Sequence, residues 1–416
     1  MFTFLNQAFH SLRGAAPTPF MVFFAYVWLL WGAKAVLARR YRPYTAEPGE
    51  RTSTVIVPVY NESAELFREC LASIAVQEPT ELIAVVDGGD PGLVTVAADW
   101  CDRVLELPKA GKRAAIAAGL AAAEPGTDVV LLVDSDTVWT PGTLVELLRP
   151  FDDARVAGVT PRQAIIDPES APSRRLADWI EDLRYHLTIP AQSLFGQVGC
   201  LAGRTIAYRR EALEPAVERL VDQRILGVPV EVGDDRVLTN ELLRNGWRAV
   251  YQSTALVVTD APSDWRSFWK QQLRWGRSSQ RETLLSLGWL WRRPAAFVCF
   301  ASDIAIPFAL FALVAFSLGH VVHPVESASR GRLIDPELLL AYPGMITSIG
   351  VRQISHFRRR NSDLVRLPLF VLQLTLVMVP VRIIAFATML HQGWGTRAPS
   401  MRGSLRETAC AESGHG

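Results

Sequence analysis

The sequence lacks the cysteine spacing of a disulfide framework or a zinc site. No CxxC pair occurs, and its five cysteines are isolated: Cys70, Cys101, Cys200, Cys299 and Cys410. Both kinds of site need cysteines close together in pairs, so neither is predicted, and a reducing compartment fits better.

Net charge, repeats and a P-loop are lacking as well. The 416 residues carry 43 Lys plus Arg against 42 Asp plus Glu, so the overall charge gives no reason to predict nucleic-acid binding. No repeat of roughly 20 to 50 residues occurs, which excludes a solenoid. No GxxxxGK[ST] motif occurs, which excludes a phosphate loop of the P-loop type.

Apolar residues are abundant, at 49 % of the chain, and they concentrate at its two ends. Residues 20–37 are nearly all apolar and predict a membrane-spanning helix. Arg39, Arg40 and Arg42 follow this stretch, whereas only Arg13 precedes it, so the positive-inside rule puts the next part of the chain in the cytoplasm. A cleaved signal peptide is the alternative, but no small-residue cleavage site follows.

The C-terminal third holds further apolar runs. Residues 297–318 are long enough to span a membrane, and 338–351 form a shorter run. Residues 367–390 contain Pro380, which leaves two alternatives: one kinked spanning helix, or a break at Pro380 followed by an interfacial helix. Residues 263–291 are rich in Trp and Arg, which is typical of an interfacial membrane helix. A nucleic-acid groove is the alternative there.

The middle of the chain has the rhythm of an α/β protein. Apolar strands alternate with helical patterns, which predicts a mostly parallel sheet with strands at 54–59, 82–86, 104–107, 129–133 and 156–159. Residues 174–194 read as an amphipathic helix and 235–245 as another, ended by Gly246.

Carboxylates follow the ends of two of these strands. Asp134 and Asp136 come directly after 129–133, at the edge of an open α/β sheet where ligands bind. Oxygen ligands of this kind suit a divalent cation that bridges to a diphosphate. Asp87 ends the second strand and could accept hydrogen bonds from a nucleobase or ribose, whereas Lys112 and Arg113 open a helix that would meet an anion. Ordinary turns and caps are the alternative at each place.

Two later motifs add groups for chemistry. Asp234 and Asp235 stand at a helix N-terminus, where one could take a proton from an attacking hydroxyl, with simple helix capping as the alternative. Gln271, Arg274 and Trp275 lie on the predicted interfacial helix and offer a cation for a leaving diphosphate and a flat ring for a sugar.

The order of these motifs resembles membrane-bound processive family 2 glycosyltransferases, which include cellulose, chitin and hyaluronan synthases. The chain looks most like the bacterial hyaluronan synthases, because it carries Val86-Asp-Gly, Gly111-Lys-Arg, Gly233-Asp-Asp-Arg-Val-Leu-Thr-Asn240, Gln271-Gln-Leu-Arg-Trp and Trp394-Gly-Thr-Arg397 in that order.

The resemblance implies an α/β GT-A-like (Rossmann-like) cytoplasmic domain with transmembrane and interfacial helices. It implies catalysis by Asp235 as general base, with Asp234 and Arg274, and a Mg²⁺ or Mn²⁺ ion on Asp136. It also implies a UDP-sugar site that includes a closing loop near the C-terminus, with these residues: Tyr60, Glu62, Asp87, Lys112, Arg113, Asp134, Gln271, Trp275, Trp394, Thr396 and Arg397. The acceptor would bind near Cys200, Gly203 and Arg204, where the chain departs from the pattern Cys-x-Ser-Gly-Pro-Leu-Gly of that group.

We therefore expect a multi-pass enzyme of the plasma membrane that polymerises UDP-sugars and moves the growing polysaccharide across the bilayer, with no nucleic-acid partner. The expected parts, in chain order, are an N-terminal segment (1–42), the transferase domain (43–262), interface helices (263–293), membrane helices (294–391) and the closing loop with a polar tail (392–416). Hyaluronan from UDP-GlcNAc and UDP-glucuronate is the leading product. The alternatives are another β-linked glycan, a non-processive transferase acting on a lipid phosphate, and a non-enzymatic membrane-tethered glycan-binding protein.

Overall fold

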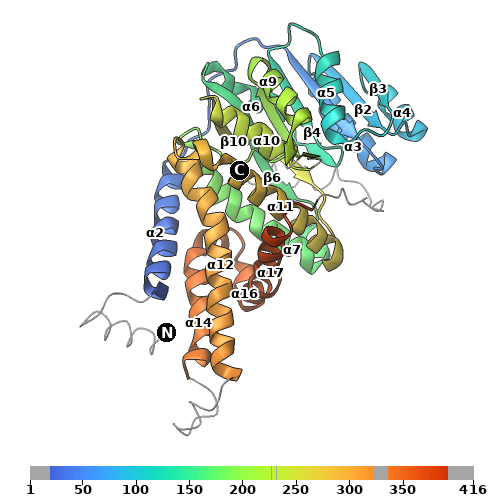
Figure 1. Cartoon of the computed structure of the whole chain (residues 1–416). Coiled ribbons are helices and arrows are strands. Elements are labelled where there is room, and N and C mark those ends of the chain that lie inside the picture. The colour runs from blue at the N-terminus through green and yellow to red at the C-terminus, as the bar shows by residue number, and fades with distance from the viewer. Residues whose placement is uncertain (1–18, 226, 231, 323–335, 392–416) are drawn as a thin grey trace.

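The chain forms an α/β domain from which a group of long helices extends (Figure 1). This computed structural model describes residues 19–225, 227–230, 232–322 and 336–391. Within these residues, eight strands form one sheet in the order β3-β2-β1-β4-β7-β6-β10-β5. The strands are β1 (Ser53–Val59), β2 (Glu81–Asp87), β3 (Arg103–Leu107), β4 (Val129–Val133), β5 (Thr137–Trp139), β6 (Val156–Ile165), β7 (Thr205–Arg209) and β10 (Arg248–Thr259). A separate two-stranded pairing joins β8 (Arg224–Ile225) to β9 (Val228–Pro229).

The central strands are buried on both faces, as their unbroken apolar sequences predict. Alternate residues of β1 enter two different cores: Val55 and Val57 pack on one side and Ile56 on the other. Helices α3 (Ala64–Ala75), α4 (Pro91–Ala98) and α6 (Thr143–Leu148) contribute to the first core. Helices α5 (Lys112–Ala122), α9 (Arg210–Asp222) and α10 (Asp234–Arg244) contribute to the second.

The five predicted strands all form, but the sheet is mixed rather than mostly parallel. Strands β1, β2, β3 and β4 pair in parallel, whereas β7 runs antiparallel between β4 and β6. Strand β7 is only five residues long and begins with Thr205 and ends with Arg209, so it lacks the apolar run that marked the others. Strands β5 and β10 were also not predicted. The predicted helix at 235–245 forms as α10, and Gly246 follows it with a φ of +96°.

The predicted amphipathic helix at 174–194 forms in three continuous pieces. Helix α7 (Pro172–Leu183) passes through a π-helical turn at Arg184–Thr188 into α8 (Ile189–Ser193). Pro190 lacks the N–H that would continue the ordinary pattern, which accounts for the widened turn. Helix α11 (Trp265–Leu290) covers the Trp- and Arg-rich segment, and the Asp264 carboxylate accepts a hydrogen bond from the Ser267 N–H at its start.

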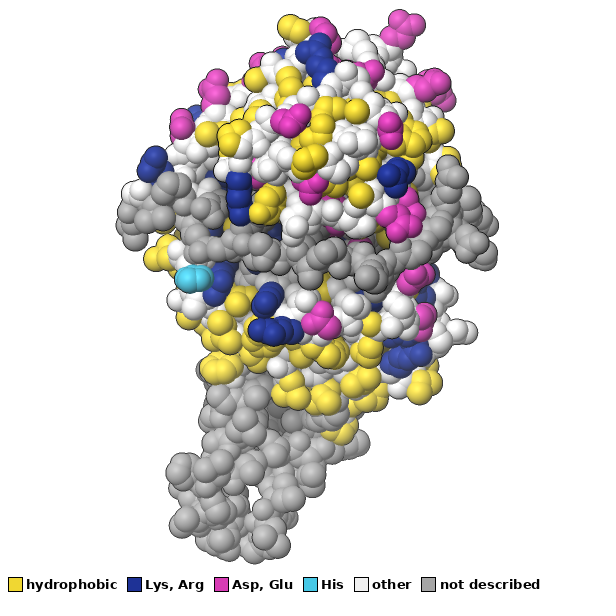
Figure 2. All heavy atoms as spheres, turned by 90° about the vertical axis from the view of Figure 1, so that its right-hand side faces the viewer, with side chains coloured by type: hydrophobic (Ala, Val, Ile, Leu, Met, Phe, Trp, Pro, Cys, Tyr) yellow, Lys and Arg dark blue, Asp and Glu magenta, His cyan; other side chains and the backbone are white. Residues whose placement is uncertain are grey.

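Long apolar helices extend away from the sheet. They are α2 (Pro19–Arg40), α12 (Pro294–Val322), α14 (Pro336–Arg352) and the consecutive helices α16 (Leu367–Gln373) and α17 (Val379–Ala387). The short α15 (Ile354–Arg359) lies between α14 and α16. Within the described residues, Pro294–Ala312 and Leu367–Ala387 are long and apolar enough to cross a membrane. Figure 2 shows hydrophobic side chains gathered at the lower part of the described surface, with Lys and Arg just above them.

The segment 367–387 stays helical through Pro380, so the break that one of the two alternatives predicted there does not occur, whereas the crossing of a membrane stays a prediction. A π-helical turn at Leu374–Met378 precedes the proline and joins α16 to α17. The extra residue in this turn accommodates the missing N–H of Pro380 without ending the helix.

Helix α15 is fastened to α7 by a buried group of aromatic and charged side chains. The His356 ring stacks on Trp179, with ring centroids 4.7 Å apart. Its Nδ1 lies 2.7 Å from Asp182 Oδ2 and its Nε2 lies 3.0 Å from Asp363 Oδ2. Burial alone would raise the pKa of Asp182, but hydrogen bonds from His186, His356 and Arg359 hold that pKa well below its usual range. The chain after α14 is thereby attached to the α/β domain.

Replacing His356 with phenylalanine is expected to lower the free energy of unfolding by about 3 kcal/mol. The ring would still stack on Trp179, but Asp182 and Asp363 would each lose a buried hydrogen-bonding partner. Thermal unfolding of the purified protein measures the effect. Arg358→Ala, at an exposed position of the same helix, is the control and should change stability by less than about 0.5 kcal/mol. Equal stability of His356→Phe and the unmodified protein would contradict this role for the histidine.

Candidate active site

The two aspartates predicted after β4 lie at its carboxyl end, near the middle of the sheet. The Asp134 N–H donates to the Arg204 carbonyl at 3.0 Å, and the Thr137 N–H donates to the Asp134 carbonyl at 3.1 Å. These bonds fold the Asp134-Ser-Asp136 turn against the start of β7. Asp136 is only 4 % exposed. The turn is therefore held rigidly at the edge of the sheet where ligands of α/β proteins bind.

Lys112 joins this turn to α10. It opens α5 directly after Gly111, whose φ of +89° suits the sharp entry into the helix. Its Nζ lies 2.6 Å from Asp134 Oδ1 and 3.0 Å from Asp234 Oδ2. Burial alone would lower the pKa of Lys112, but the two carboxylates outweigh burial and raise it. The side chain is therefore a permanent ammonium that bridges two motifs far apart in the sequence.

Asp234 and Asp235 begin α10 with different properties. Burial would raise the pKa of Asp234, but the Lys112 ammonium outweighs it and the pKa is lowered. Burial and the neighbouring Asp234 charge raise the pKa of Asp235, although Asp235 Oδ1 accepts a hydrogen bond from the Arg236 N–H at 2.7 Å. Asp235 is thus the more basic of the two carboxylates, which suits it for accepting a proton.

The segment after Cys200 passes directly in front of Asp235. A Cβ atom added at Gly203 would lie 3.5 Å from Asp235 Cβ and 3.6 Å from Lys112 Nζ, so little space separates these groups. Cys200 Sγ lies 3.7 Å from Asp235 Oδ2. Burial, and then the Asp235 charge, raise the pKa of Cys200 to about 12. The cysteine is therefore a neutral thiol that donates to Asp235, and a thiolate nucleophile is excluded.

Arg204 connects this segment to α11. It is 9 % exposed, and its Nη1 lies 3.1 Å from Glu181 Oε1 and 3.0 Å from Gln163 Oε1. Its guanidinium lies 5.7 Å from the centre of the Trp275 ring. The carbon side of the guanidinium can stack on an aromatic face while its N–H groups donate to oxygen. The structure therefore brings the predicted acceptor segment next to the helix that carries Gln271, Arg274 and Trp275.

Helix α11 is packed tightly on both sides. A Cβ atom at Gly233 would lie 1.8 Å from Ser278 Oγ, and one at Gly276 would lie 2.8 Å from Ala385 Cβ in α17. The Gln280 Nε2 donates to the Arg382 carbonyl at 3.0 Å. Glycine at 233 and 276 thus lets α11 approach α10 and the candidate span α17 at once.

The predicted nucleotide side lies next to these carboxylates. The Asp87 oxygens accept hydrogen bonds from the Ala110 N–H at 2.6 Å and the Gly111 N–H at 2.9 Å. Asp87 therefore fixes the loop that leads into α5. A contact between Asp87 and a nucleobase stays a prediction. At the ends of the neighbouring strands, Tyr60 lies under Lys109 with 4.8 Å to the ring centre, and Glu62 Oε2 accepts from Ser135 Oγ at 3.3 Å.

The Arg113 guanidinium lies against the segment that links α9 to α10. Its guanidinium donates to the Leu220 carbonyl at 2.8 Å, to Gln223 Oε1 at 3.0 Å and to the Val232 carbonyl at 3.2 Å. These bonds hold the segment between α9 and α10 in place. A nucleotide contact by Arg113 stays a prediction, as do those of Trp394, Thr396 and Arg397, which lie outside the described residues.

The sequence did not single out several groups of this region. Glu181 lies near the end of α7 and Arg184 begins the π-helical turn that follows it; Arg184 Nη2 donates to the Cys200 carbonyl at 3.3 Å. Tyr208 of β7 is fully buried beside the aspartates of α10. Glu181 and Arg184 both lie on the polar face of the amphipathic helix predicted at 174–194. The apolar face predicted the helix, whereas the polar face was the signal that could have identified these two residues.

Comparison with known proteins identifies the family. Residues 49–278 match the model described as "Glycosyltransferase like family 2". The chain is 30 % identical to the hyaluronan synthase of Streptococcus pyogenes over 378 residues, which are 88 % of this chain and 87 % of that one. The chain belongs to glycosyltransferase family 2. This family 2 enzyme is also 35 % identical to an N-acetylglucosaminyltransferase of Rhizobium leguminosarum bv. viciae over 243 residues, 56 % of this chain and 57 % of that one.

A solved structure supports the fold of this family 2 glycosyltransferase. The mannosyltransferase PcManGT from Pyrobaculum calidifontis superposes with a TM-score of 0.56 at 20 % identity, over 85 % of this chain and 97 % of that chain. The predicted α/β GT-A-like fold with additional helices is thus confirmed, and so is the prediction of a hexosyltransferase.

Proposed function

We propose that this family 2 glycosyltransferase polymerises UDP-sugars into an extracellular polysaccharide and passes the chain across the plasma membrane. One observation carries the proposal: Lys112 pairs with both Asp134 and Asp234 next to the proposed base Asp235, and helix α11 forms one side of this site. Helix α11 in turn packs on the candidate span α17. A transferase site that shares a wall with a membrane helix suits an enzyme that adds sugars and moves its product onward.

The proposed reaction is an in-line displacement with inversion. Asp235 takes the proton from an acceptor hydroxyl, the resulting oxygen attacks the anomeric carbon, and the bond to the UDP leaving group breaks. Asp235 has the raised pKa that a general base needs. Asp234 and Lys112 hold α10 against the β4 turn, and Arg274 with Gln271 and Trp275 on α11 would face the diphosphate and the acceptor sugar.

A divalent cation fits the Asp134–Asp136 turn. Among the described residues, no three acidic, His or Cys side chains form a metal cluster. Mg²⁺ commonly binds to one or two carboxylates and completes its ligands with substrate phosphates, so Asp136 alone can supply the protein ligand. Asp134 already pairs with Lys112. When bound, Mg²⁺ or Mn²⁺ would neutralise charge on the leaving diphosphate. The solved structure of PcManGT is a complex with GDP-Man and Mn²⁺.

The remaining roles follow the same proposal. The donor site would include Tyr60, Glu62 and Asp87, and the acceptor site Cys200, Gly203 and Arg204. The transferase domain (43–262) would lie in the cytoplasm, with the interface helices (263–293) on the bilayer surface and the membrane helices (20–37 and those within 294–391) in the bilayer. The buried contacts of α15 with α7 support a cytoplasmic position for the chain that follows α14.

Hyaluronan is the leading product because the S. pyogenes relative, a hyaluronan synthase by name, matches over most of both chains. A β-linked glycan made from UDP-GlcNAc alone is the second candidate. It is favoured by the N-acetylglucosaminyltransferase relatives.

The decisive test supplies the purified full-length protein with UDP-GlcNAc, UDP-glucuronate or both, with Mg²⁺ or Mn²⁺, and digests the product with hyaluronidase. Polymer that needs both donors and is degraded supports hyaluronan. Polymer from UDP-GlcNAc alone, resistant to the enzyme, supports the second candidate. Excess EDTA is expected to stop synthesis, and re-added Mn²⁺ to restore it. No polymer under any of these conditions, with the protein folded, would refute the proposed function.

Synthesis is expected to fall as the pH is lowered. A general base works only when it is deprotonated, and the raised pKa of Asp235 moves this loss to a higher pH than an ordinary aspartate would give. The logarithm of kcat should approach a slope of one against pH on the acid side. Initial rates at saturating donor between about pH 4 and pH 8 measure this. A flat profile down to the ordinary pKa of aspartate, about 3.9, would contradict the assignment.

A further inference from the structure

The backbone of residues 198–204 is held by side chains where it passes the proposed base, because this segment contains no helix or strand. The Cys200 carbonyl accepts a hydrogen bond from Arg184 Nη2 at 3.3 Å. The Leu201 N–H donates to Thr239 Oγ1 at 3.1 Å. These two groups belong to the same peptide bond, so both of its polar atoms are bound. Arg184 and Thr239 together therefore fix the orientation of this peptide.

Thr239 links this peptide to the backbone of the proposed base. Its hydroxyl donates to the Asp235 carbonyl at 2.7 Å, one turn earlier in α10, while its oxygen accepts from the Leu201 N–H. Threonine in a helix often bonds to the carbonyl four residues earlier, but here the same hydroxyl also holds a second segment. Thr239 is fully buried, so water does not replace it in this role. Cys200 Sγ lies 3.7 Å from Asp235 Oδ2, which gives a second contact between the same two parts.

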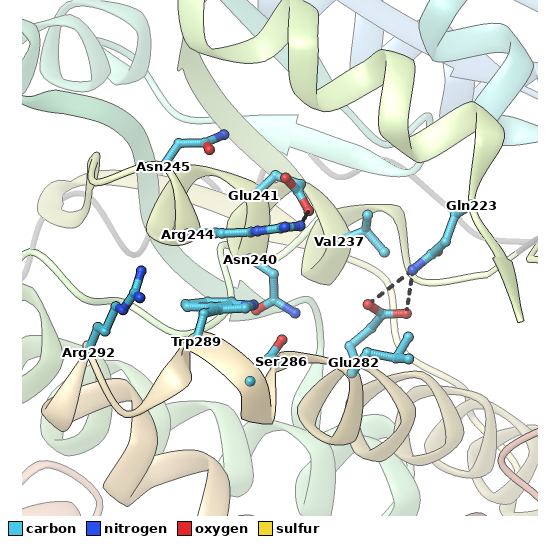
Figure 3. A pocket seen from close by; sticks show the side chains of 12 residues that line it. Gln223, Val237, Asn240, Glu241, Arg244, Asn245, Glu282, Ser286, Trp289 and Arg292 are labelled. Carbon is cyan, nitrogen blue, oxygen red and sulfur yellow. Dashed lines mark hydrogen bonds and ion pairs between the residues drawn. The ribbon is translucent and has the colours of Figure 1, made fainter.

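Thr239 lies on the side of α10 that carries the base. At about 100° per residue, it lies about 40° around the helix from Asp235. From the same helix, Val237, Asn240 and Glu241 line a cavity of about 580 Å³ toward α11, whereas Thr239 does not (Figure 3). A substitution of Thr239 therefore acts on the link between Leu201 and Asp235 and leaves the lining of this cavity unchanged.

We propose that Thr239 is a positioning residue that sets the distance between the base and the segment to which the acceptor sugar binds. The inference rests on the proposed function, in which Asp235 takes the proton of an acceptor hydroxyl. That hydroxyl must lie within hydrogen-bonding reach of the Asp235 carboxylate, and a displacement of about 1 Å can lower the rate by about 100-fold. The proposed donor groups come from the ends of β1, β2 and β4, so donor binding should not depend on this link.

The test compares Thr239→Val and Thr239→Ser with the unmodified full-length protein. Valine has nearly the same shape but leaves the Leu201 N–H without its acceptor, whereas serine keeps the hydroxyl. Thr239→Val is expected to lower kcat for polymer synthesis by about 10- to 100-fold and to change the KM for the UDP-sugar by less than about twofold. Thr239→Ser should recover most of the rate. Hydrolysis of the UDP-sugar, in which water replaces the acceptor, does not use residues 198–204 and should keep its rate. Radiolabelled polymer and free sugar, separated by chromatography, measure the two reactions.

Thr95→Val is the matched control. Thr95 Oγ1 also donates to the carbonyl four residues earlier, at 2.9 Å, but it lies exposed on α4. This variant should leave both reactions unchanged. If Thr239→Val keeps the full kcat, or loses polymer synthesis and hydrolysis to the same extent, Thr239 does not position the acceptor and the inference is overturned.

Hydrogen–deuterium exchange separates this inference from the proposed function. The Leu201 N–H should exchange faster in Thr239→Val than in the unmodified protein, and Thr239→Ser should restore its protection. Equal exchange in all three proteins overturns the link, whether or not they make polymer. If the unmodified protein makes no polymer, the proposed function fails and the positioning role fails with it, while the exchange rates still decide whether Thr239 holds Leu201.

Discussion

Replacing Asp235 with asparagine is expected to lower kcat for polymer synthesis by about 10³-fold, within the range that a general base contributes. The amide has nearly the same shape but cannot take the proton of the acceptor hydroxyl. Because Asp235 does not pair with Lys112, the ion pairs of Asp134 and Asp234 should persist, and the KM for the UDP-sugar should change little. Initial rates of radiolabelled sugar incorporation at varied donor concentrations measure both parameters.

Asp222→Asn is the matched control for this experiment. It makes the same chemical change at an exposed position at the end of α9 and should leave kcat unaltered. If Asp235→Asn keeps more than about a tenth of the activity while its pH profile is unchanged, another group accepts the proton.

Replacing Lys112 with methionine is expected to destabilise the protein by about 3 to 5 kcal/mol and to abolish detectable synthesis. Methionine fills a similar volume but leaves the carboxylates of Asp134 and Asp234 facing each other without the ammonium that now lies 2.6 and 3.0 Å away. The pKa of Asp234, now lowered by Lys112, should rise as well. Chemical denaturation followed by intrinsic fluorescence measures the stability.

Lys109→Met is the control, since Lys109 is exposed and its Nζ lies 4.8 Å from the centre of the Tyr60 ring. Its effect on stability should be below about 1 kcal/mol. A Lys112→Met protein as stable as this control would show that the bridge between the β4 turn and α10 carries little energy.

The sequence was sufficient to locate most of the chemical groups but not their partners. The run Val129–Val133 followed by Asp134 and Asp136 has a local signature, because a buried strand and its polar end are contiguous. The bridge from Lys112 to Asp234 has none, since its two residues stand more than a hundred positions apart and meet only when α5 and α10 pack on one face of the sheet.

The same distinction explains why the sequence did not predict the backbone contacts of Asp87 and Arg113 or the strand β7. The sequence around a carboxylate at a strand end does not distinguish one that binds a ligand from one that binds backbone N–H groups of the next loop. Asp87 makes hydrogen bonds of the second kind. Arg113 follows Lys112 directly, yet one residue of helix turns its side chain by about 100° toward the Leu220 carbonyl. Strand β7 is recruited by its neighbours β4 and β6, and short strands of this kind depend on tertiary pairing more than on their own residues.

The two close approaches of α11 imply that the catalytic and membrane parts cannot be separated by cutting the chain. Gly233, just before the helix α10 that carries Asp235, packs against Ser278 of α11. Two residues before Ser278, Gly276 of α11 packs against Ala385 of α17. A protein ending after Pro262 would keep the eight-stranded sheet and the five aspartates of the site, yet it would lack helix α11, on which α10 packs. A displacement of α17 against Gly276 would therefore shift α11, and through Ser278 the start of the helix that carries the proposed base.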